Sequence, residues 1–162
     1  MIKVGIGQDS HRFEEKPSGK PLVLGGLIIP RHKALDGNSD ADVVLHALTN
    51  AISSVTGVNI LGKIADDMCK SGITDSKAYV KEALKYMNRM TVSHVAISIE
   101  CKTPKLFDHI PLMKKSVADL LSISPDSVGI TATSGEGLTA FGQGLGIQAF
   151  CILTVLCTPE SV

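Results

Sequence analysis

The segment 39–57 constrains the fold most, because it carries a clear helical pattern. Its apolar side chains recur three or four residues apart and would share one face of a helix: Val43, Val44, Ala47, Leu48, Ala51, Ile52 and Val55. Ser39 or Asp40 is expected to cap the start of this helix, and Gly57 is expected to follow its last turn. A helix with one apolar face is stable only against another layer of structure, so the rest of the chain must supply that layer.

Strand patterns on both sides of this segment supply the second layer. Residues 2–7 alternate apolar with small or polar side chains, as in a half-buried strand. Further strands are expected at 92–101, 128–132 and 147–156, a hairpin of two short strands at 22–30 around Gly25 and Gly26, and two more helices at 74–87 and 110–122. A short segment at 60–65 and a polar linker are expected to join the first two helices.

This order of elements predicts the fold class. Strands and helices are interleaved without strict repetition of a strand–helix–strand unit. We therefore expect an α+β fold: one mixed sheet of four or five strands with helices on one face, plus a small N-terminal hairpin. The chain has 162 residues, a length that suits one domain, and residues 1–162 are expected to form it.

Charge and hydropathy exclude several classes of protein. Sixteen basic and sixteen acidic residues cancel, which argues against nucleic acid or an anionic membrane as the main partner. No apolar stretch approaches the roughly 20 residues of a membrane-spanning helix, and the N-terminus lacks the apolar core of a secretory signal. The four cysteines form no Cys-x-x-Cys pair, so we expect free thiols in a reducing cytoplasm.

A first candidate for chemistry is Asp9-Ser10-His11, just after the first predicted strand. In extended backbone, Asp9 and His11 point to the same side and can reach one point. A carboxylate oxygen and an imidazole nitrogen are both common zinc ligands. The Asp-x-His pattern also occurs often by chance, so alone it is weak evidence for a metal site.

A second candidate is His46, on the polar face of the first predicted helix. A single helix histidine is more often simply exposed or partly buried. Here, however, the helix start offers free backbone N–H groups and the positive end of the helix dipole, which favour an anion such as phosphate. Asp9, His11 and His46 together would make three zinc ligands with the fourth position open, which is the pattern of a catalytic site.

Two loops offer further polar groups. The glycine-rich loop before the last strand carries hydroxyl donors at Thr133 and Ser134. It also carries Glu136, a lone carboxylate of the kind that holds a hard divalent cation beside phosphates. The plain alternative is a β-turn with solvated polar residues. Lys105, in the turn 102–111, can meet a phosphate or a base, although by itself this is an ordinary turn before a helix.

With these segments in place, the chain resembles the 2-C-methyl-D-erythritol 2,4-cyclodiphosphate synthase family over essentially its whole length. The combination of Asp9-x-His11 with Ser39-Asp-x-Asp-x-x-x-His46 is specific. The segments that carry the resemblance are 7–13, 24–30, 38–49, 104–105, 109–111 and 131–136.

The resemblance implies a homotrimer with active sites at the subunit interfaces. It implies Zn²⁺ on Asp9, His11 and His46, and a second ion, Mg²⁺ or Mn²⁺, near Glu136, bridging the substrate diphosphate. The implied substrate-binding residues are Asn38, Ser39, Gly62, Pro104, Lys105, Thr133, Ser134 and Glu136, and the implied catalytic residues among them are Thr133 and Glu136.

The implied activity is that of a metal-dependent phosphorus–oxygen lyase of isoprenoid biosynthesis. The substrate would be 4-diphosphocytidyl-2-C-methyl-D-erythritol 2-phosphate, a small cytidine diphosphate compound. Its 2-phosphate attacks the β-phosphorus, a cyclic diphosphate forms and CMP leaves. The attacking group is already an anion, so no strong general base is needed. The protein must instead hold the substrate for in-line attack and neutralise the phosphate charge.

The chain departs from the family pattern at several positions. Asn38 stands where a histidine is usual, and Asn50 and Ile60 stand where acidic residues are usual. Gln143 and Leu145 stand where many members have Arg and Glu. The departures at Asn38, Asn50 and Ile60 motivate an alternative, a homologue that binds zinc and cytidine nucleotide but catalyses weakly. A general zinc phosphohydrolase is a third interpretation, but no second-metal carboxylate cluster accompanies the predicted zinc site.

Overall fold

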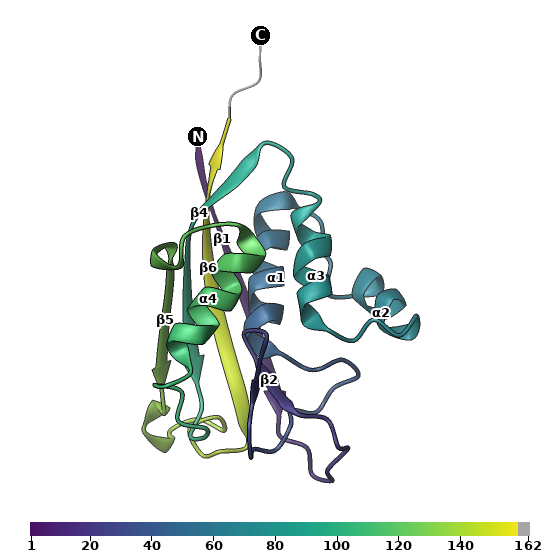
Figure 1. Cartoon of the computed structure of the whole chain (residues 1–162), viewed down its shortest axis with the longest axis vertical. Coiled ribbons are helices and arrows are strands. Elements are labelled where there is room, and N and C mark those ends of the chain that lie inside the picture. The colour runs from purple at the N-terminus through teal and green to yellow at the C-terminus, as the bar shows by residue number, and fades with distance from the viewer. Residues whose placement is uncertain (159–162) are drawn as a thin grey trace.

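A four-stranded mixed sheet forms the centre of the fold, with its strands in the order β1-β6-β4-β5 (Figure 1). The computed structural model describes residues 1–158. The strands are β1 (Ile2–Arg12), β4 (Met90–Glu100), β5 (Val128–Thr133) and β6 (Gly146–Cys157). β6 pairs antiparallel with both β1 and β4, while β4 and β5 run parallel. The predicted mixed sheet is therefore confirmed, with four strands.

Helices cover one face of this sheet, as the sequence predicts. α1 (Val43–Thr56) packs against β1 and β6, and α4 (Ile110–Leu121) packs against β5 (Figure 1). α3 (Ser76–Leu84) packs beside α1. Side chains such as Leu48 of α1 and Leu153 of β6 are fully buried between the two layers. This burial of apolar surface is the main favourable contribution to folding.

One helix is absent from the sequence prediction. α2 (Lys63–Lys70) occupies the stretch that we expected to be a short segment and a linker. At 8 residues it is too short for its apolar positions, Ile64, Ala65 and Met68, to establish a helical repeat. In Figure 1, α2 lies at the outer side of the molecule, beyond α3.

The first strand is longer than predicted. β6 continues to pair with β1 as far as the Arg12–Gly146 pair, so the hydrogen-bonded ladder holds the chain extended beyond residue 7. Asp9 and His11 consequently lie inside the strand and not after it. Their side chains keep the predicted common direction, because residues two apart in a strand point to the same face.

The start of α1 also differs from the prediction. Asp42 is the N-cap, and its carboxylate accepts hydrogen bonds from the backbone N–H groups of the first turn, whereas Ser39 and Asp40 were expected there. The helix begins no earlier because Ala41 has a left-handed φ of 55°, which breaks the helical path. The predicted end is confirmed: Gly57 closes the helix with a φ of 76°.

The predicted hairpin is confirmed. It consists of β2 (Leu22–Leu24) and β3 (Leu27–Ile29), joined by Gly25 and Gly26. Both glycines have positive φ, 60° and 78°, which two-residue turns between antiparallel strands require and which glycine adopts without steric cost.

β1 and α1 approach so closely that two positions on the strand have no room for a side chain. A Cβ atom at Gly7 would lie 2.0 Å from the carbonyl oxygen of Ala47, and one at Gly5 would lie 2.3 Å from that of Ala51. The backbone of the strand therefore rests directly on the helix. This contact brings His46, one residue before Ala47, within reach of Asp9.

The sheet face opposite the helices carries a row of exposed apolar side chains. On β1 and β6 these are between 43% and 65% exposed: Ile2, Val4, Ile6, Phe150, Ile152 and Leu156. They form one continuous surface, because Ile6 pairs with Ile152 and Ile2 pairs with Leu156 across the two strands. We call these six residues the apolar sheet face.

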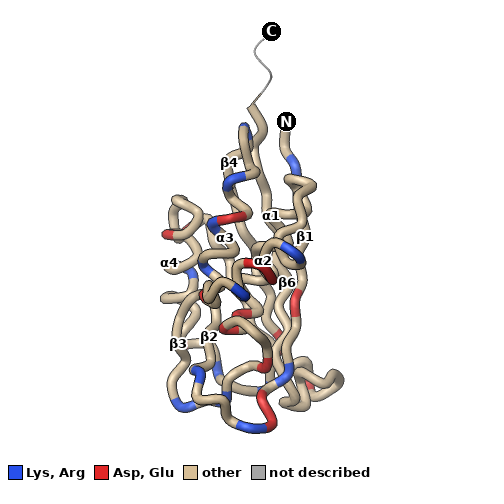
Figure 2. The backbone as a smooth tube through the Cα atoms, turned by 90° about the vertical axis from the view of Figure 1, so that its right-hand side faces the viewer, with Lys and Arg blue, Asp and Glu red and all other residues tan. Residues whose placement is uncertain are grey.

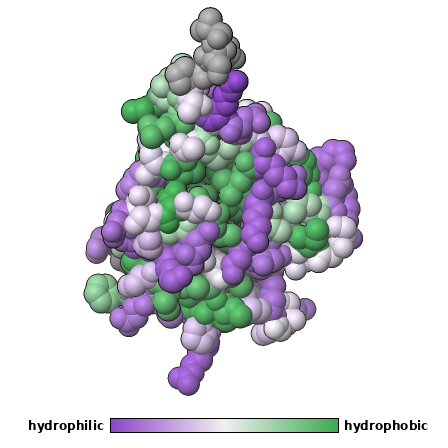
Figure 3. Space-filling view, turned by 45° about the horizontal axis from the view of Figure 1, so that its top comes forward, coloured by the Kyte–Doolittle hydropathy of each residue, from purple (hydrophilic) through white to green (hydrophobic). Residues whose placement is uncertain are grey.

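Charges of both signs are interspersed along the chain, as Figure 2 shows. The face seen in Figure 3 is likewise a mixture of hydrophilic and hydrophobic residues. No helix in the part of the chain that the structure describes is long and apolar enough to cross a membrane.

Candidate active site

Asp9, His11 and His46 lie together where β1 meets α1. The Oδ2 atom of Asp9 is 3.0 Å from Nδ1 of His46 and 3.1 Å from Nε2 of His11. The three potential ligand atoms all lie within 4.8 Å of one another. The structure thus brings together the three residues that the sequence offers as metal ligands.

Three local features position these side chains. Asp9 and His11 project from the same face of β1. His46 belongs to the first turns of α1 and is 7% exposed, so its ring is held by its surroundings. The Nδ1 atom of His11 lies 2.6 Å from the carbonyl oxygen of Asp36, which fixes the ring and leaves Nε2 directed at Asp9. A carbonyl acceptor on the second ring nitrogen is the usual arrangement for a metal-binding histidine.

The electrostatics of the cluster favour an ionised Asp9. Burial opposes the charged form, but the hydrogen bonds with His11 and His46 outweigh it and lower the pKa of Asp9 to about 2. The hydrogen bond with Asp9 in turn raises the pKa of His11 above its usual value. Both shifts have the same cause, the hydrogen bonds between the Asp9 carboxylate and the imidazole rings.

The donor set fits a divalent metal ion. One carboxylate oxygen and two imidazole nitrogens are ligands of zinc and of neighbouring transition metals. Ligand atoms around one tetrahedral zinc ion are about 3.3 Å apart, because each bond is about 2.0 to 2.2 Å long. The two distances from Asp9, 3.0 and 3.1 Å, are close to that spacing.

A cleft of about 230 Å³, which we call the metal-side cleft, opens beside the cluster. Asp9 and His46 line it, and so do Asn38, Ser39 and Gly62, which the family resemblance implies as substrate-binding residues. The remaining lining residues are Leu61, Ala65, Asp66, Cys69 and Tyr79.

The sequence reasoning did not find Asp66, Cys69 or Tyr79 as cleft residues. Asp66 and Cys69 come from α2, which was not predicted, and no local motif marks them. The departure at Ile60 does not face the cleft, since its side chain is fully buried in the core. Its neighbours Leu61 and Gly62 line the cleft instead.

A second cleft of about 270 Å³, the turn-side cleft, lies at the ends of β4 and β5. Pro104, Lys105, Thr133 and Ser134 line it, so the structure gathers these four predicted residues in one place. They meet because β4 and β5 are parallel and adjacent, so the loops that leave them lie side by side. Cys101 and Phe107 also line this cleft.

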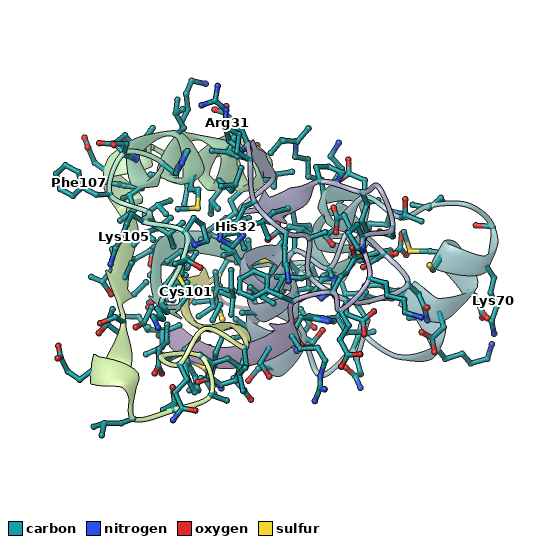
Figure 4. The ribbon with its side chains drawn as sticks, turned by 90° about the horizontal axis from the view of Figure 1, so that it is seen from below. Arg31, His32, Lys70, Cys101, Lys105 and Phe107 are labelled. Atoms are coloured by element: carbon teal, nitrogen blue, oxygen red, sulfur yellow. The ribbon has the colours of Figure 1, made fainter. Side chains whose placement is uncertain are left out.

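Seen from below in Figure 4, Lys105 and Phe107 lie on one side of the molecule, whereas Lys70, at the end of α2, lies on the opposite side. The metal-side cleft and the turn-side cleft share no lining residue. Three strand spacings separate β1 from β5 across the sheet, which is roughly 14 Å.

Glu136 lines neither cleft. It is exposed on the short turn η2 (Gly135–Gly137), with a left-handed φ of 53°. Among the departures in the neighbouring loop, Gln143 donates a hydrogen bond to the carbonyl oxygen of Gly137, and Leu145 is 62% exposed. Asn50 donates to the carbonyl oxygen of Gln8 and so joins α1 to β1.

Comparison with known proteins bears directly on this site. A family model described as the YgbB family matches residues 2–156. The chain belongs to the YgbB family. Curated relatives that carry the expected family name confirm the resemblance seen in the sequence.

One such relative, the 2-C-methyl-D-erythritol 2,4-cyclodiphosphate synthase of Chlamydia trachomatis serovar L2b (strain UCH-1/proctitis), is 53% identical over 158 residues. That alignment covers 96% of this chain and 89% of the relative. The synthase of Chlamydia felis (strain Fe/C-56) is 52% identical, with 96% and 90% covered.

Solved structures of this YgbB-type fold agree with the architecture. A 2C-methyl-D-erythritol-2,4-cyclodiphosphate synthase in a CDP-bound form superposes with a TM-score of 0.84 at 29% identity, over 95% of this chain and 100% of that chain. The bifunctional IspDF of Campylobacter jejuni superposes with a TM-score of 0.87 at 26% identity, over 98% of this chain and 43% of that longer chain.

Proposed function

We propose that this chain converts 4-diphosphocytidyl-2-C-methyl-D-erythritol 2-phosphate into 2-C-methyl-D-erythritol 2,4-cyclodiphosphate and CMP. The observation that carries the proposal is the convergence of Asp9, His11 and His46 beside the metal-side cleft. Curated relatives more than half identical to this chain, which are named as synthases of this product, support it. The CDP-bound structural neighbour supports a cytidine nucleotide as part of the ligand.

Asp9, His11 and His46 would hold Zn²⁺, and Glu136 would contribute to a site for Mg²⁺ or Mn²⁺ on the substrate diphosphate. When bound, these ions supply Lewis-acid stabilisation of phosphate charge. The zinc assignment is supported by the mixed oxygen and nitrogen donor set and by the spacing of the ligand atoms.

The chain's own residues would orient the substrate. The side-chain amide of Asn38 and the hydroxyl of Ser39, which both line the metal-side cleft, would donate to the 2-phosphate. Lys105, in the turn-side cleft, would bring a positive charge to the diphosphate, and Pro104 would contact the cytidine. The hydroxyls of Thr133 and Ser134 would donate to the phosphates, with Thr133 acting as catalytic residue together with Glu136.

The reaction needs no general base from the protein. A phosphate oxygen attacks the β-phosphorus, the bond from that phosphorus to the CMP oxygen breaks, and CMP leaves as an anion. The barrier arises from holding two phosphate groups together in line and from the crowding of their charges. Donor groups that are already held in position, such as Thr133 and Lys105, would lower both contributions to this barrier.

A complete site would require more than one copy of the chain. The two clefts lie towards opposite edges of the sheet and share no residue, yet a single substrate must contact both sets of groups. The family resemblance implies a homotrimer, and we propose that in it the metal-side cleft of one subunit faces the turn-side cleft of its neighbour. The apolar sheet face is the surface that such an assembly would bury.

The proposal extends to the chain as a whole. We treat residues 1–162 as one synthase domain, supported by a single cluster of buried apolar residues that runs from Leu22 to Val155. All four cysteines lie within the described residues and are free thiols, as is usual for proteins of a reducing compartment. We therefore place the reaction in the cytoplasm.

The deciding experiment incubates the full-length protein with Zn²⁺, Mg²⁺ and the substrate, and follows the products by ³¹P NMR and chromatography. Equal amounts of CMP and cyclic diphosphate are expected. Release of inorganic phosphate would instead identify a phosphohydrolase, and no turnover by zinc-loaded protein would contradict the proposal. Lys105→Ala should lower turnover strongly, whereas the control Lys81→Ala, on α3, should not.

A further inference from the structure

A chain of hydrogen bonds runs from the partly buried Asp40 through Ser76 to His46. The hydroxyl of Ser76 lies 2.9 Å from Nε2 of His46 and also contacts the carboxylate of Asp40. The backbone N–H of Ser76 donates to the second carboxylate oxygen of Asp40 at 3.0 Å. Ser76 is fully buried, so its hydroxyl is shielded from water.

The available protons determine the direction of each hydrogen bond. An ionised carboxylate can only accept, so the Ser76 hydroxyl must donate its one proton to Asp40. The Ser76 oxygen is then left to accept from His46. Consequently Nε2 of His46 carries a proton. Nδ1, which donates to Asp9 when no ion is present, is the ring nitrogen left to bind a cation.

Nδ1 is also the nitrogen that faces the metal cluster, 3.0 Å from Oδ2 of Asp9. We propose that Asp40 and Ser76 are positioning residues that fix the tautomer and ring plane of His46 for metal binding. This inference rests on the proposed function, because it assigns a purpose to the cluster that the reaction requires. Outer partners of this kind set both the orientation and the basicity of a ligating histidine.

The capping of α3 does not explain the contact between the Ser76 hydroxyl and the His46 ring. Asp75 is the N-cap of α3, and its side chain accepts the backbone N–H of Lys77. The Ser76 hydroxyl therefore does not cap α3, and it contacts His46 of α1 instead. Tyr79, one turn further along α3, packs beside the same imidazole with a ring-centroid distance of 6.0 Å. α3 thus holds the His46 ring through a hydrogen bond and through packing.

The direct test measures zinc affinity by competition with a chelator. Ser76→Ala removes the acceptor for the Nε2 proton, and we expect about a 10- to 100-fold loss of zinc affinity, the usual effect of deleting an outer partner. Ser76→Cys keeps the size but offers only a weak acceptor, so it should lose affinity while remaining folded. Asp40→Ala is expected to behave like Ser76→Ala.

Asp75→Ala is the matched control. It removes the true cap of the same helix, one residue away, and should lower stability without changing zinc affinity. If Ser76→Ala and Ser76→Cys bind zinc as tightly as the wild type, the inference is wrong. If the wild-type protein itself neither binds zinc nor cyclises the substrate, the proposed function fails instead.

A second readout does not depend on the metal. Nitrogen-15 NMR of the metal-free wild-type protein should show a proton on Nε2 of His46, and Ser76→Ala should change that signal. A wild-type spectrum with an unprotonated Nε2 would overturn the inference, whatever the zinc measurements give.

Discussion

The carboxylate of Asp42 binds the backbone of Gly26: its Oδ2 accepts the Gly26 N–H at 2.6 Å. Its Oδ1 accepts the N–H groups of Gly25, Val44 and Leu45, at 2.9 to 3.0 Å. One fully buried side chain therefore closes the β2–β3 turn and the start of α1 together. This anchor fixes the beginning of the helix that carries His46.

Asp42→Ala should consequently cost more than the loss of an ordinary helix cap. Losing a cap costs about 1 kcal/mol, and each buried donor left without an acceptor adds about 1 kcal/mol or more. We expect the free energy of unfolding to fall by about 3 kcal/mol, measured by urea denaturation. Asp75→Ala, at an exposed cap, should cost about 1 kcal/mol. Equal losses in the two variants would contradict this account of Asp42.

Gly7→Ala should destabilise the protein and weaken metal binding. The added methyl group would lie 2.0 Å from the carbonyl oxygen of Ala47, so α1 must move away from β1. Overpacking of this kind costs about 2 to 3 kcal/mol, and the shift should separate His46 from Asp9. Thermal unfolding and zinc titration measure the two effects.

The comparison for this variant is Gly129→Ala. A methyl group there would meet its nearest neighbours at 3.9 Å, an ordinary contact, so stability should change by less than about 1 kcal/mol. If Gly7→Ala were equally mild, the close approach of strand and helix would not constrain that position.

Charge on the apolar sheet face should break up the proposed trimer. Ile6 is 61% exposed and pairs with Ile152 at the centre of that face. Ile6→Asp would place a carboxylate where neighbouring subunits meet, and an unpaired buried charge is strongly unfavourable. Light scattering coupled to size-exclusion chromatography should show a smaller species.

Leu112→Asp provides the reference for this measurement. Leu112 is 58% exposed on α4, away from the apolar sheet face, so its replacement should leave the assembly intact. A wild-type protein that elutes as a monomer at micromolar concentration would rule out the trimer.

The cysteines should differ in the pH dependence of their alkylation. Burial raises the pKa of Cys101 to about 11 and that of Cys151 to about 12. A raised pKa leaves less thiolate, the reactive form, so at pH 8 only about one Cys101 thiol in a thousand is ionised. Cys69, at the metal-side cleft, should react first with iodoacetamide, and the reaction of the two buried thiols should accelerate as the pH rises towards 10.

Peptide mapping by mass spectrometry gives the rate at each cysteine. In urea all four thiols should react alike, because the cause of the difference is burial in the native state. Labelling of Cys151 as fast as Cys69 in the native protein at pH 8 would show that this part of the core opens readily.

Much of the fold was predictable because its signals are local. The apolar stripe of 39–57, the alternation in the strands and the Gly25-Gly26 turn each depend on residues close together in the sequence. The pairing of Asp9 with His11 follows from strand geometry alone. Their meeting with His46 depended on an additional feature, the two side-chain-free positions on β1 that admit α1.

Other features could not be predicted, because long-range contacts decide them. The segment 39–42 offers several possible caps, and the choice of Asp42 depends on the hairpin turn that it also binds. Ser76 meets His46 only because α3 packs on α1, since the two residues are 30 positions apart in the sequence. The short α2 has too few residues for a helical repeat of apolar side chains. The cleft residues that it contributes therefore could not be predicted.

The placement of the two clefts at opposite edges of one sheet has a genetic consequence. Each working pocket would draw its metal ligands from one polypeptide and its cytidine contacts from another. A chain with a damaged His46 and a chain with a damaged Lys105 should therefore complement each other when mixed, since some interfaces would pair two intact halves. A chain that carries both substitutions has neither half intact and cannot be complemented in this way.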